Sequence, residues 1–313
     1  MFWIESLTNV HVQKRNCMFK AKPYKIAVAS GKGGTGKTFV ATNLFRVLKD
    51  AGKKVTLIDC DAEAPNSMAF FNTRITKTLD ISLPIPYIDT ELCTFCGKCH
   101  EYCNYNAIFF LPNFRIIKVI EELCHSCGAC LVACNDGAIT EKQVKLGEVV
   151  FHTCNEKTEL IEARTRVGVM TPVPVIKAAI KEMNKENEIA IMDAPPGTSC
   201  PFIHTVNSAD YVILVTEPTP FGLSDLKRSV DTLRQMDKLY GVIVNRAGIG
   251  DESVYGYLED ENIELLAEIP FDKRIAQFYS RGEIAVNNMP SLKKQLYETF
   301  EKTLNHGTGN NQR

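Results

Sequence analysis

Short apolar runs alternate with segments of helical periodicity along most of the chain. The first run, residues 24–30, precedes a glycine-rich turn and a helical stripe in which Phe39 and Leu44 lie on one side. This helix is expected to end at Gly52, and a second apolar run at 55–59 follows it. The pattern predicts a strand–helix–strand unit at this point in the chain.

The same alternation resumes after about residue 152. Further strands are predicted at apolar runs that recur at 189–192, 211–215, 240–244 and 263–266. A helix is expected over 224–239, with Ser224 as its N-cap. Nearly continuous apolar strands separated by helices are typical of a parallel sheet covered on both faces. The predicted fold class is therefore α/β, with a doubly wound, mostly parallel sheet.

A segment of different character separates these two regions. It begins near a proline-rich stretch and holds eight of the twelve cysteines, between Cys93 and Cys134. Residues 93–108 and 124–139 are two copies of one pattern, 31 residues apart, which suggests a duplicated unit with pseudo-twofold symmetry. The predicted domains are one α/β domain formed by 1–82 and 152–313 and, between its halves, a small inserted domain at 83–151.

Composition narrows the possible functions. The 313 residues carry a formal net charge of -1, which argues against a strongly basic nucleic-acid-binding protein. No apolar run approaches the roughly 18 residues that span a bilayer, and the first residues lack the apolar core of a signal peptide. A cytoplasmic protein without membrane or nucleic-acid partners is expected. Clustered cysteines in such a chain are more typical of metal ligands than of disulfides.

The glycine-rich turn after the first predicted strand satisfies the phosphate-loop pattern G-x-x-x-x-G-K-[ST]. Its candidate nucleotide-binding residues are Gly31, Gly33, Gly34, Thr35, Gly36, Lys37 and Thr38. Backbone N–H groups of such a turn hold phosphates at a helix N-terminus, while Lys37 reaches the β- and γ-phosphates and Thr38 ligates Mg²⁺. Three of these glycines also fit the dinucleotide pattern G-x-G-x-x-G, with Asp59 at the end of the next strand. Lys37 and Thr38, together with a strand that ends in Asp193, favour a nucleoside triphosphate.

The sequence Lys-Gly-Gly-Thr-Gly-Lys-Thr at 32–38 resembles the deviant Walker A motif of the MinD/ParA (CobQ/CobB/MinD/ParA) superfamily, to which the nitrogenase iron protein is related. The resemblance implies an ATPase that converts ATP to ADP and phosphate. It also implies a dimer, made of two copies or of this chain and a similar ATPase, in which Lys32 reaches the nucleotide of the other subunit.

Two further motifs resemble the switches of that family. In the switch I resemblance, Asp61 positions or activates the attacking water, although a strand-end cap is the alternative role for this residue. In the switch II resemblance, Asp193 holds the Mg²⁺ shell and the Gly197 amide contacts the γ-phosphate. Asn245 follows an apolar strand at a place where the family has an asparagine that reads adenine.

The two cysteine repeats have the spacing C-x-x-C-x-x-C-x-x-x-C of bacterial two-cluster ferredoxins. The resemblance implies an α+β insert with two [4Fe–4S] clusters, in which the fourth cysteine of each repeat crosses to the other cluster. One cluster takes Cys93, Cys96, Cys99 and Cys134, and the other takes Cys124, Cys127, Cys130 and Cys103. Asn104 and Asn135 stand where ferredoxins usually have proline, which affects the turn but not ligation. A zinc site made of two C-x-x-C pairs is the alternative, although it leaves cysteines unused.

Together these motifs predict a nucleotide switch coupled to two [4Fe–4S] clusters, with ATP and Mg²⁺ bound as well. ATP-gated electron transfer to a redox partner protein is the favoured function, because eight cysteines in full ferredoxin spacing favour held clusters over transferable ones. An iron–sulfur cluster assembly or carrier ATPase is the alternative. A nicotinamide or flavin oxidoreductase and a MinD-like positioning protein are weaker ones. The sequence identifies neither the electron acceptor nor a role for Cys200.

Overall fold

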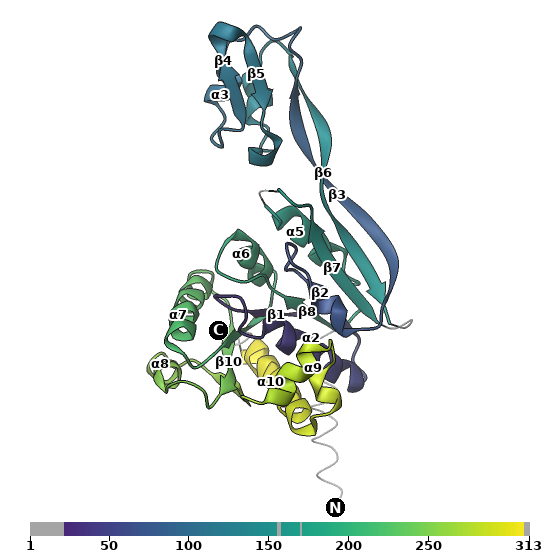
Figure 1. Cartoon of the computed structure of the whole chain (residues 1–313), viewed down its shortest axis with the longest axis vertical. Coiled ribbons are helices and arrows are strands. Elements are labelled where there is room, and N and C mark those ends of the chain that lie inside the picture. Colours follow the sequence, from purple (N-terminus) through teal and green to yellow (C-terminus); the bar gives the residue numbers. More distant parts are fainter. Residues whose placement is uncertain (1–21, 155–157, 170, 310–313) are drawn as a thin grey trace, which may run out of the picture.

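A nine-stranded mixed sheet forms the centre of the molecule (Figure 1). The computed structural model describes residues 22–154, 158–169 and 171–309. The strand order is β11-β10-β9-β1-β8-β2-β7-β6-β3; neighbours from β11 to β7 are parallel, whereas β6 and β3 run antiparallel at one edge. The strands of this sheet are β1 Tyr24–Ala29, β2 Val55–Asp59, β3 Arg74–Ile88, β6 Ile139–Thr153, β7 Glu159–Thr165, β8 Ile189–Asp193, β9 Tyr211–Thr216, β10 Tyr240–Ala247 and β11 Leu265–Pro270. The predicted α/β fold with a mostly parallel sheet is confirmed.

Helices cover both faces of the parallel part of this sheet, which explains the continuous apolar runs of its strands. One hydrophobic core lies under α5 to α8 and contains Phe202, and the other lies under α2 and α10 and contains Phe45 and Phe300. The helices are α2 Lys37–Asp50, α5 Val173–Glu182, α6 Cys200–Asn207, α7 Pro220–Gln235, α8 Ser253–Asp260, α9 Lys273–Ser280 and α10 Pro290–Gly309, with short 3₁₀ turns η1 Ser67–Phe70 and η4 Ala285–Asn287. In the part of the chain that the structure describes, no helix combines the length and the apolar character needed to cross a membrane.

Strands β3 and β6 continue beyond the sheet as a long two-stranded ribbon (Figure 1). Within the sheet, β3 packs on α5 through apolar side chains such as Leu79 and Ile81. The ribbon beyond them carries residues 89–138 at its end, and we call these residues the tip module. The elements of the tip module are α3 Lys98–Glu101, β4 Ile108–Leu111, η2 Pro112–Phe114, β5 Ile116–Val119, η3 Glu121–Leu123 and α4 Ala129–Ala133. The domain boundary predicted at residue 83 falls inside β3, so one strand belongs to both the sheet and the insertion.

The ribbon leaves the sheet at a β-bulge beside Gly147. The register of β3 and β6 shifts by one residue there, with Leu146 as the extra residue. Strand β7 ends at the same level, where the Arg166 N–H donates to the Leu146 carbonyl oxygen at 2.8 Å. A Cβ on Gly147 would overlap the Arg164 carbonyl oxygen of β7. Glycine therefore allows three strands to come together at the neck of the ribbon.

The start of α7 differs from the sequence expectation. The helix expected over 224–239 begins at Pro220, and its N-cap is Thr219 rather than Ser224. The Thr219 hydroxyl oxygen accepts a hydrogen bond from the Gly222 N–H at 3.0 Å. Proline suits the first helical position because its missing N–H has no intrahelical partner there. The pair Thr219 and Pro220 is therefore the stronger start signal, and Ser224 lies inside the helix.

Replacing Gly147 with alanine is expected to destabilise the protein by about 1–3 kcal/mol, because the new methyl group overlaps a backbone carbonyl that cannot rotate away. Gly256→Ala is the matched control. Gly256 is exposed inside α8 with open space around it, so alanine there is expected to be neutral or stabilising by up to about 1 kcal/mol. Chemical denaturation measures both, and equal stability of the two variants would contradict the close packing at the neck.

Candidate functional site

The phosphate loop lies between β1 and α2, at the carboxyl ends of the parallel strands. Gly36, directly before α2, has a φ of +99°, a left-handed conformation that favours glycine. A Cβ on Gly36 would also overlap the side-chain amide of Asn245. That amide donates to the Thr35 carbonyl oxygen at 2.8 Å. The loop is therefore fixed by a side chain from β10 as well as by its own glycines.

Lys37 is the buried cation of this loop. The residue is 7% exposed, and its Nζ donates to the Lys32 carbonyl oxygen at 3.4 Å. Burial lowers the pKa of Lys37, while the charges of Asp193 and Asp61 act in the opposite direction. The phosphate-loop lysine and the aspartates of the two switch motifs therefore meet at one place.

Two buried carboxylates, Asp59 and Asp193, stand side by side at the ends of β2 and β8. Asp59 accepts hydrogen bonds from the backbone N–H groups of Asn66 and Ser67, at 2.9 and 2.8 Å. The Ser67 hydroxyl donates to Asp193 Oδ2 at 3.0 Å. Burial raises the pKa of both carboxyl groups, and the charge of Asp193 raises the pKa of Asp59 further. The turn that follows the switch I motif is thus tied to both acids.

Atoms suited to Mg²⁺ and phosphate lie unpaired beside these acids. Among the described residues, Asp193 Oδ1 and Thr35 Oγ1 are buried and have no hydrogen-bond partner, a costly state for a polar atom. The Thr38 side chain, which hydrogen bonds to Asp193, lies next to them. Carboxylate and hydroxyl oxygens are the hard ligands that Mg²⁺ prefers, so these residues fit the ion that the phosphate-loop motif implies.

Lys32 binds a carboxylate of its own chain in this structure. Its Nζ lies 2.8 Å from Glu217 Oε1, and Arg246 Nη1 lies 2.7 Å from Glu217 Oε2. Although burial acts in the opposite direction, these two cations hold the pKa of Glu217 below its ordinary value. Arg246 Nη2 also donates to the Gly34 carbonyl oxygen at 3.3 Å. Glu217 thus holds both cations against the phosphate loop, and neither Glu217 nor Arg246 was singled out from the sequence.

A cavity with an empty volume of about 1120 Å³, partly open to solvent, lies beside the phosphate loop. Residues predicted from the sequence line part of it: Gly33, Gly34, Gly36, Lys37, Thr38, Asp61 and Asn245. Residues without a predicted role line another part: Phe271, Asp272, Ile275 and Tyr279. Phe271 and Asp272 directly follow the carboxyl end of β11, and this position after a parallel strand is the signal that would have found them. Ile275 and Tyr279 lie on α9, and no local signal in the sequence marks them.

Gly31 and Gly197 make contacts within the protein. A Cβ on Gly31 would overlap the Asp225 carbonyl oxygen, so glycine allows α7 to approach the loop. The Gly197 N–H donates to the Ser30 carbonyl oxygen at 3.1 Å. The contact of this amide with a γ-phosphate stays a prediction.

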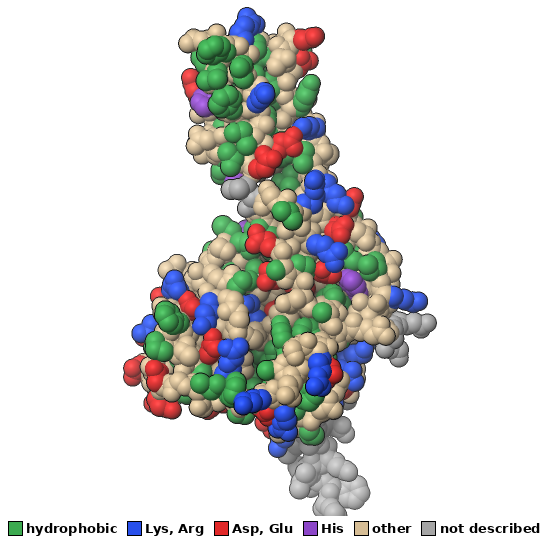
Figure 2. Space-filling model, in the orientation of Figure 1, with side chains coloured by type: hydrophobic (Ala, Val, Ile, Leu, Met, Phe, Trp, Pro, Cys, Tyr) green, Lys and Arg blue, Asp and Glu red, His purple; other side chains and the backbone are tan. Residues whose placement is uncertain are grey.

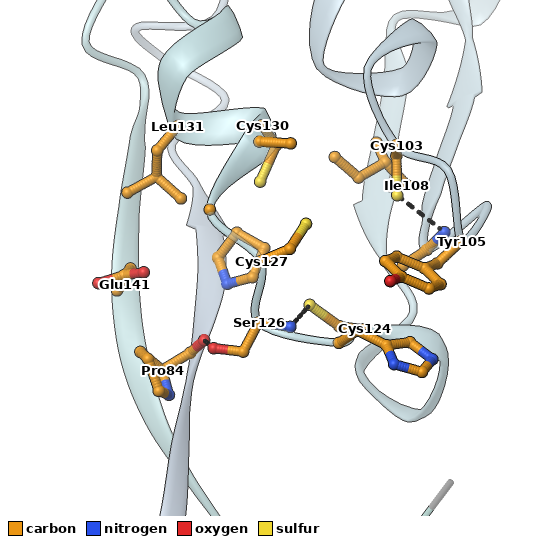
Figure 3. A pocket seen from close by; sticks show the side chains of 15 residues that line it. Pro84, Cys103, Tyr105, Ile108, Cys124, Ser126, Cys127, Cys130, Leu131 and Glu141 are labelled. Atoms are coloured by element: carbon orange, nitrogen blue, oxygen red, sulfur yellow. Dashed lines mark hydrogen bonds between the residues drawn. The ribbon is translucent and has the colours of Figure 1, made fainter. Parts of the chain in front are cut away.

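The eight predicted cluster ligands all lie in the tip module. Four of them line a cavity with an empty volume of about 400 Å³ and point their sulfur atoms toward it (Figure 3): Cys103, Cys124, Cys127 and Cys130. Three others are close neighbours in the first repeat: Cys93, Cys96 and Cys99. The eighth, Cys134, follows α4. The cavity therefore joins one cysteine of the first repeat to three of the second.

Matching turns surround the cysteines of the two repeats. The Phe95 N–H donates to Cys93 Sγ at 3.4 Å. The Ser126 N–H donates to Cys124 Sγ at the same distance. Phe95 and Ser126 have φ values of +56° and +54°, which are uncommon for residues other than glycine. Soft thiolates that also accept N–H bonds fit an iron–sulfur cluster, and strain repeated at equivalent positions is typical of a ligand-holding turn.

Contacts between the repeats obey the pseudo-twofold symmetry. The Thr94 hydroxyl donates to Asp136 at 2.7 Å, and the Tyr105 ring stacks on His125 with centroids 3.9 Å apart. Thr94 and His125 are equivalent in the duplication, and so are Tyr105 and Asp136. Each contact joins the first cysteine loop of one repeat to the turn that follows the fourth cysteine of the other. The repeats are therefore interleaved at both ends.

The remaining cysteines are dispersed. Cys60 is buried beside Asp59, Cys154 is half-buried, and Cys200 is exposed at the start of α6; Cys17 lies outside the described residues. Within the described ranges, no group of three or more His, Cys, Asp or Glu side chains is arranged to hold a single metal ion. Burial raises the pKa of the Cys99 thiol to about 11, so this thiol must release a proton when it becomes a ligand.

Comparison with known proteins agrees with the nucleotide site. The model of the CobQ/CobB/MinD/ParA nucleotide binding domain matches residues 26–286. The chain belongs to this family. It is 33% identical over 263 residues to an uncharacterized protein of Methanocaldococcus jannaschii, covering 82% of this chain and 90% of that one. It is 25% identical over 300 residues to the iron-sulfur cluster carrier protein of Pyrococcus abyssi, covering 90% and 86%.

Solved structures share the fold. The cell division ATPase MinD of Pyrococcus furiosus superposes with a TM-score of 0.56 at 22% identity, covering 89% of this chain and 98% of that chain. The predicted superfamily and its α/β fold are thus confirmed, and membership of the family supports ATP binding and ATPase activity.

The buried acid pair predicts how stability depends on pH when nucleotide and Mg²⁺ are absent. Asp59 and Asp193 have higher pKa values in the folded protein than in the unfolded chain, where an aspartate has a pKa near 4. Their favourable contribution to the free energy of unfolding is therefore fully present below about pH 4. It is lost as the pH rises through the pKa values of the folded protein. The melting temperature is therefore expected to fall between about pH 5 and about pH 8. Asp59→Asn should flatten this dependence, whereas Asp260→Asn, at an exposed position, should not. Calorimetry across this range measures the slopes, and parallel slopes would refute the assignment.

Proposed function

We propose that this protein is an ATPase whose nucleotide cycle controls a module that holds two [4Fe–4S] clusters for electron transfer to a partner protein. The observation that carries the proposal is the short path from the nucleotide site to the ribbon. Ser67 bonds to both Asp59 and Asp193 and opens η1, and the chain enters β3 at Arg74. A change in these bonds on hydrolysis moves the start of β3, the strand that continues into the ribbon.

Hydrolysis rests on positioning and electrostatics, which supply most of the catalysis in phosphoryl transfer. Lys37 and the loop N–H groups hold the phosphates, and Thr38 and Asp193 hold Mg²⁺. Asp61, whose charge acts on Lys37, orients the attacking water. Mg²⁺ supplies charge neutralisation of the phosphates when bound.

A dimer is part of the proposal. In the dimer Lys32 acts on the nucleotide of the other subunit, which is a second copy or a similar ATPase. Lys32 must then leave Glu217, to which it is bound here at 2.8 Å. Arg246 remains on Glu217 at 2.7 Å, so this carboxylate keeps a partner and its release of Lys32 costs less.

The tip module supports the assignment of two clusters. Cys103, Cys124, Cys127 and Cys130 hold one of them, and Cys93, Cys96, Cys99 and Cys134 hold the other. A bound [4Fe–4S] cluster supplies one-electron redox chemistry. The side chains around the two sets of cysteines differ. The Tyr105–His125 stack lines the cavity of the set that contains Cys124, whereas a Thr94–Asp136 hydrogen bond joins residues next to Cys93 and near Cys134 of the other set. Because hydrogen bonding and exposure tune cluster potentials, the two sites are expected to differ in potential.

A cluster carrier is the second candidate, and the names of relatives favour it. Several relatives, including that of Pyrococcus abyssi, are called iron-sulfur cluster carrier proteins. The two functions differ in one observable. Incubation with an apo-ferredoxin empties a carrier of iron, whereas an electron-transfer module keeps its iron.

Anaerobic electron paramagnetic resonance of the reduced, iron-counted protein is expected to show two clusters whose spectrum changes when MgATP is added. Ser67→Ala should abolish this change, because it removes the bond to Asp193. Ser224→Ala, at an exposed position of α7, should keep the wild-type response. A wild-type spectrum that does not change with MgATP would contradict the coupling between the nucleotide site and the clusters. A protein without iron would contradict the cluster assignment.

Lys37→Ala is expected to slow ATP hydrolysis by about 100-fold or more, since it removes the buried cation that faces the phosphates. Lys54→Ala, an exposed lysine at the other end of β2, should keep full activity. Phosphate release measures the rate, and iron analysis should give equal cluster content in both variants. Loss of iron in Lys37→Ala alone would mean that the tip module does not fold independently of the nucleotide site.

A further inference from the structure

The tip module exposes an apolar surface on its β4–β5 hairpin. Side chains alternate along these strands, so Phe110 and Ile117 point into the module and their neighbours point outward. The outward apolar residues, together with Phe114 at the turn, form what we call the hairpin face: Phe109, Leu111, Phe114 and Ile116. Phe114 is 74% exposed. Figure 2 shows apolar side chains gathered on the outer part of the module.

The duplication supplies an internal reference for this face. The end of the ribbon next to the tip module, where residues 85–88 of β3 pair with residues 139–142 of β6, is the equivalent of the β4–β5 hairpin in the other half. Phe109 there corresponds to Thr140, and Leu111 corresponds to Lys142. The same backbone pairing therefore forms with polar side chains at these two positions, although Ile85, the equivalent of Ile116, is apolar and buried. Folding of the hairpin does not require apolar side chains at Phe109 and Leu111, and exposed apolar patches of this kind mark interaction sites.

The hairpin face lies over the cysteines of the first repeat. A Cβ on Gly97, between Cys96 and Cys99, would overlap the Phe110 ring, so β4 packs directly on this cysteine loop. The Arg115 guanidinium lies 4.6 Å from the centroid of the Phe95 ring, in the same loop. Only the thickness of one hairpin therefore separates the face from these cysteines, and Figure 1 shows β4 and β5 at the end of the molecule far from the main sheet.

Charge and size indicate which occupant fits this face. Residues 108–119 contain Arg115 and Lys118 and no acidic residue. Two copies meeting through this hairpin would oppose cations to cations, whereas an acidic partner complements them. Four apolar side chains make a small contact, typical of transient electron-transfer complexes rather than of stable dimers.

We propose that the hairpin face docks an acidic one-electron carrier protein beside the cluster of Cys93, Cys96, Cys99 and Cys134. The proposal rests on the proposed electron-transfer function. One electron passes between the two proteins, so one partner is oxidised and the other reduced by one equivalent, and no covalent bond forms or breaks. The hairpin face provides the apolar contact area, and the charges of Arg115 and Lys118 orient the acidic partner.

Calorimetric titration of the oxidised holoprotein with oxidised flavodoxin, a small acidic flavoprotein, tests the docking without any electron transfer. In the double variant Phe109→Thr/Phe114→Ser, the first change copies Thr140 of the other half and the second removes the exposed ring at the turn. This variant is expected to weaken binding by about tenfold or more, as truncation at the centre of a small interface does. Lys118→Glu should also weaken binding, and added salt should weaken binding to the wild type.

Tyr87→Thr is the matched control, because Tyr87 is an exposed aromatic residue at the position in the other half that is equivalent to Lys118. It should bind flavodoxin like the wild type. Equal affinity of all variants, or no binding to the wild type, overturns the docking proposal. Self-association that the double variant abolishes also overturns it, in favour of a second copy. Iron content distinguishes failure of the docking proposal from failure of the proposed function. A protein that holds no iron contradicts the proposed function, whereas a protein that holds its clusters and does not bind flavodoxin contradicts only the docking proposal.

Discussion

The pair of buried carboxylates at the ends of β2 and β8 is the constraint on which the site depends. Parallel neighbours place Asp59 and Asp193 side by side, where burial raises the pKa of both. Such a pair is tolerated only when donors and cations surround it. Lys37 and the N–H groups of the turn at Ser67 fill this role here. In the proposed function, bound nucleotide with Mg²⁺ changes the charge at this point, and the turn at Ser67 responds to that change.

The ribbon is the element that connects the nucleotide site to the tip module in the proposed function. Its first strand begins a few residues after Ser67, and the β-bulge at Leu146 and Gly147 directs it away from the sheet. Strand β3 packs on α5 near the sheet, and the far end of the ribbon packs on the tip module, where the Ser126 hydroxyl donates to the Pro84 carbonyl oxygen at 2.6 Å. A rotation of the ribbon where it leaves the sheet would displace the tip module further than the pivot, because displacement grows with distance from the axis.

The two repeats of the tip module share one backbone conformation at their cysteine turns and differ in the side chains around those turns. The turns at Phe95 and Ser126 are alike in conformation and in their bonds to sulfur. The side chains around them differ, with a stacked ring pair on one side and a hydroxyl–carboxylate bond on the other. In the proposed function, this shared backbone gives both halves the same ligand geometry. Changing the side chains gives each half its own polarity and its own outer surface.

The sequence by itself determined the elements whose signal is local. The glycine-rich loop, the strands that end in Asp59 and Asp193, and the cysteine spacing all depend on residues close together in the chain, so pattern alone located them. Other features of the site join segments that are far apart in the chain. These are the hydrogen bond of Asn245 to the phosphate loop, the ion pair of Lys32 with Glu217, and the residues after β11 that line the cavity. Only the strand order brings these together. The sequence pattern did not predict the ribbon either. A two-stranded ribbon buries few side chains, so its strands show only a weak alternation of apolar and polar residues. Tertiary structure decided these features because they are contacts between strands and not properties of any one segment.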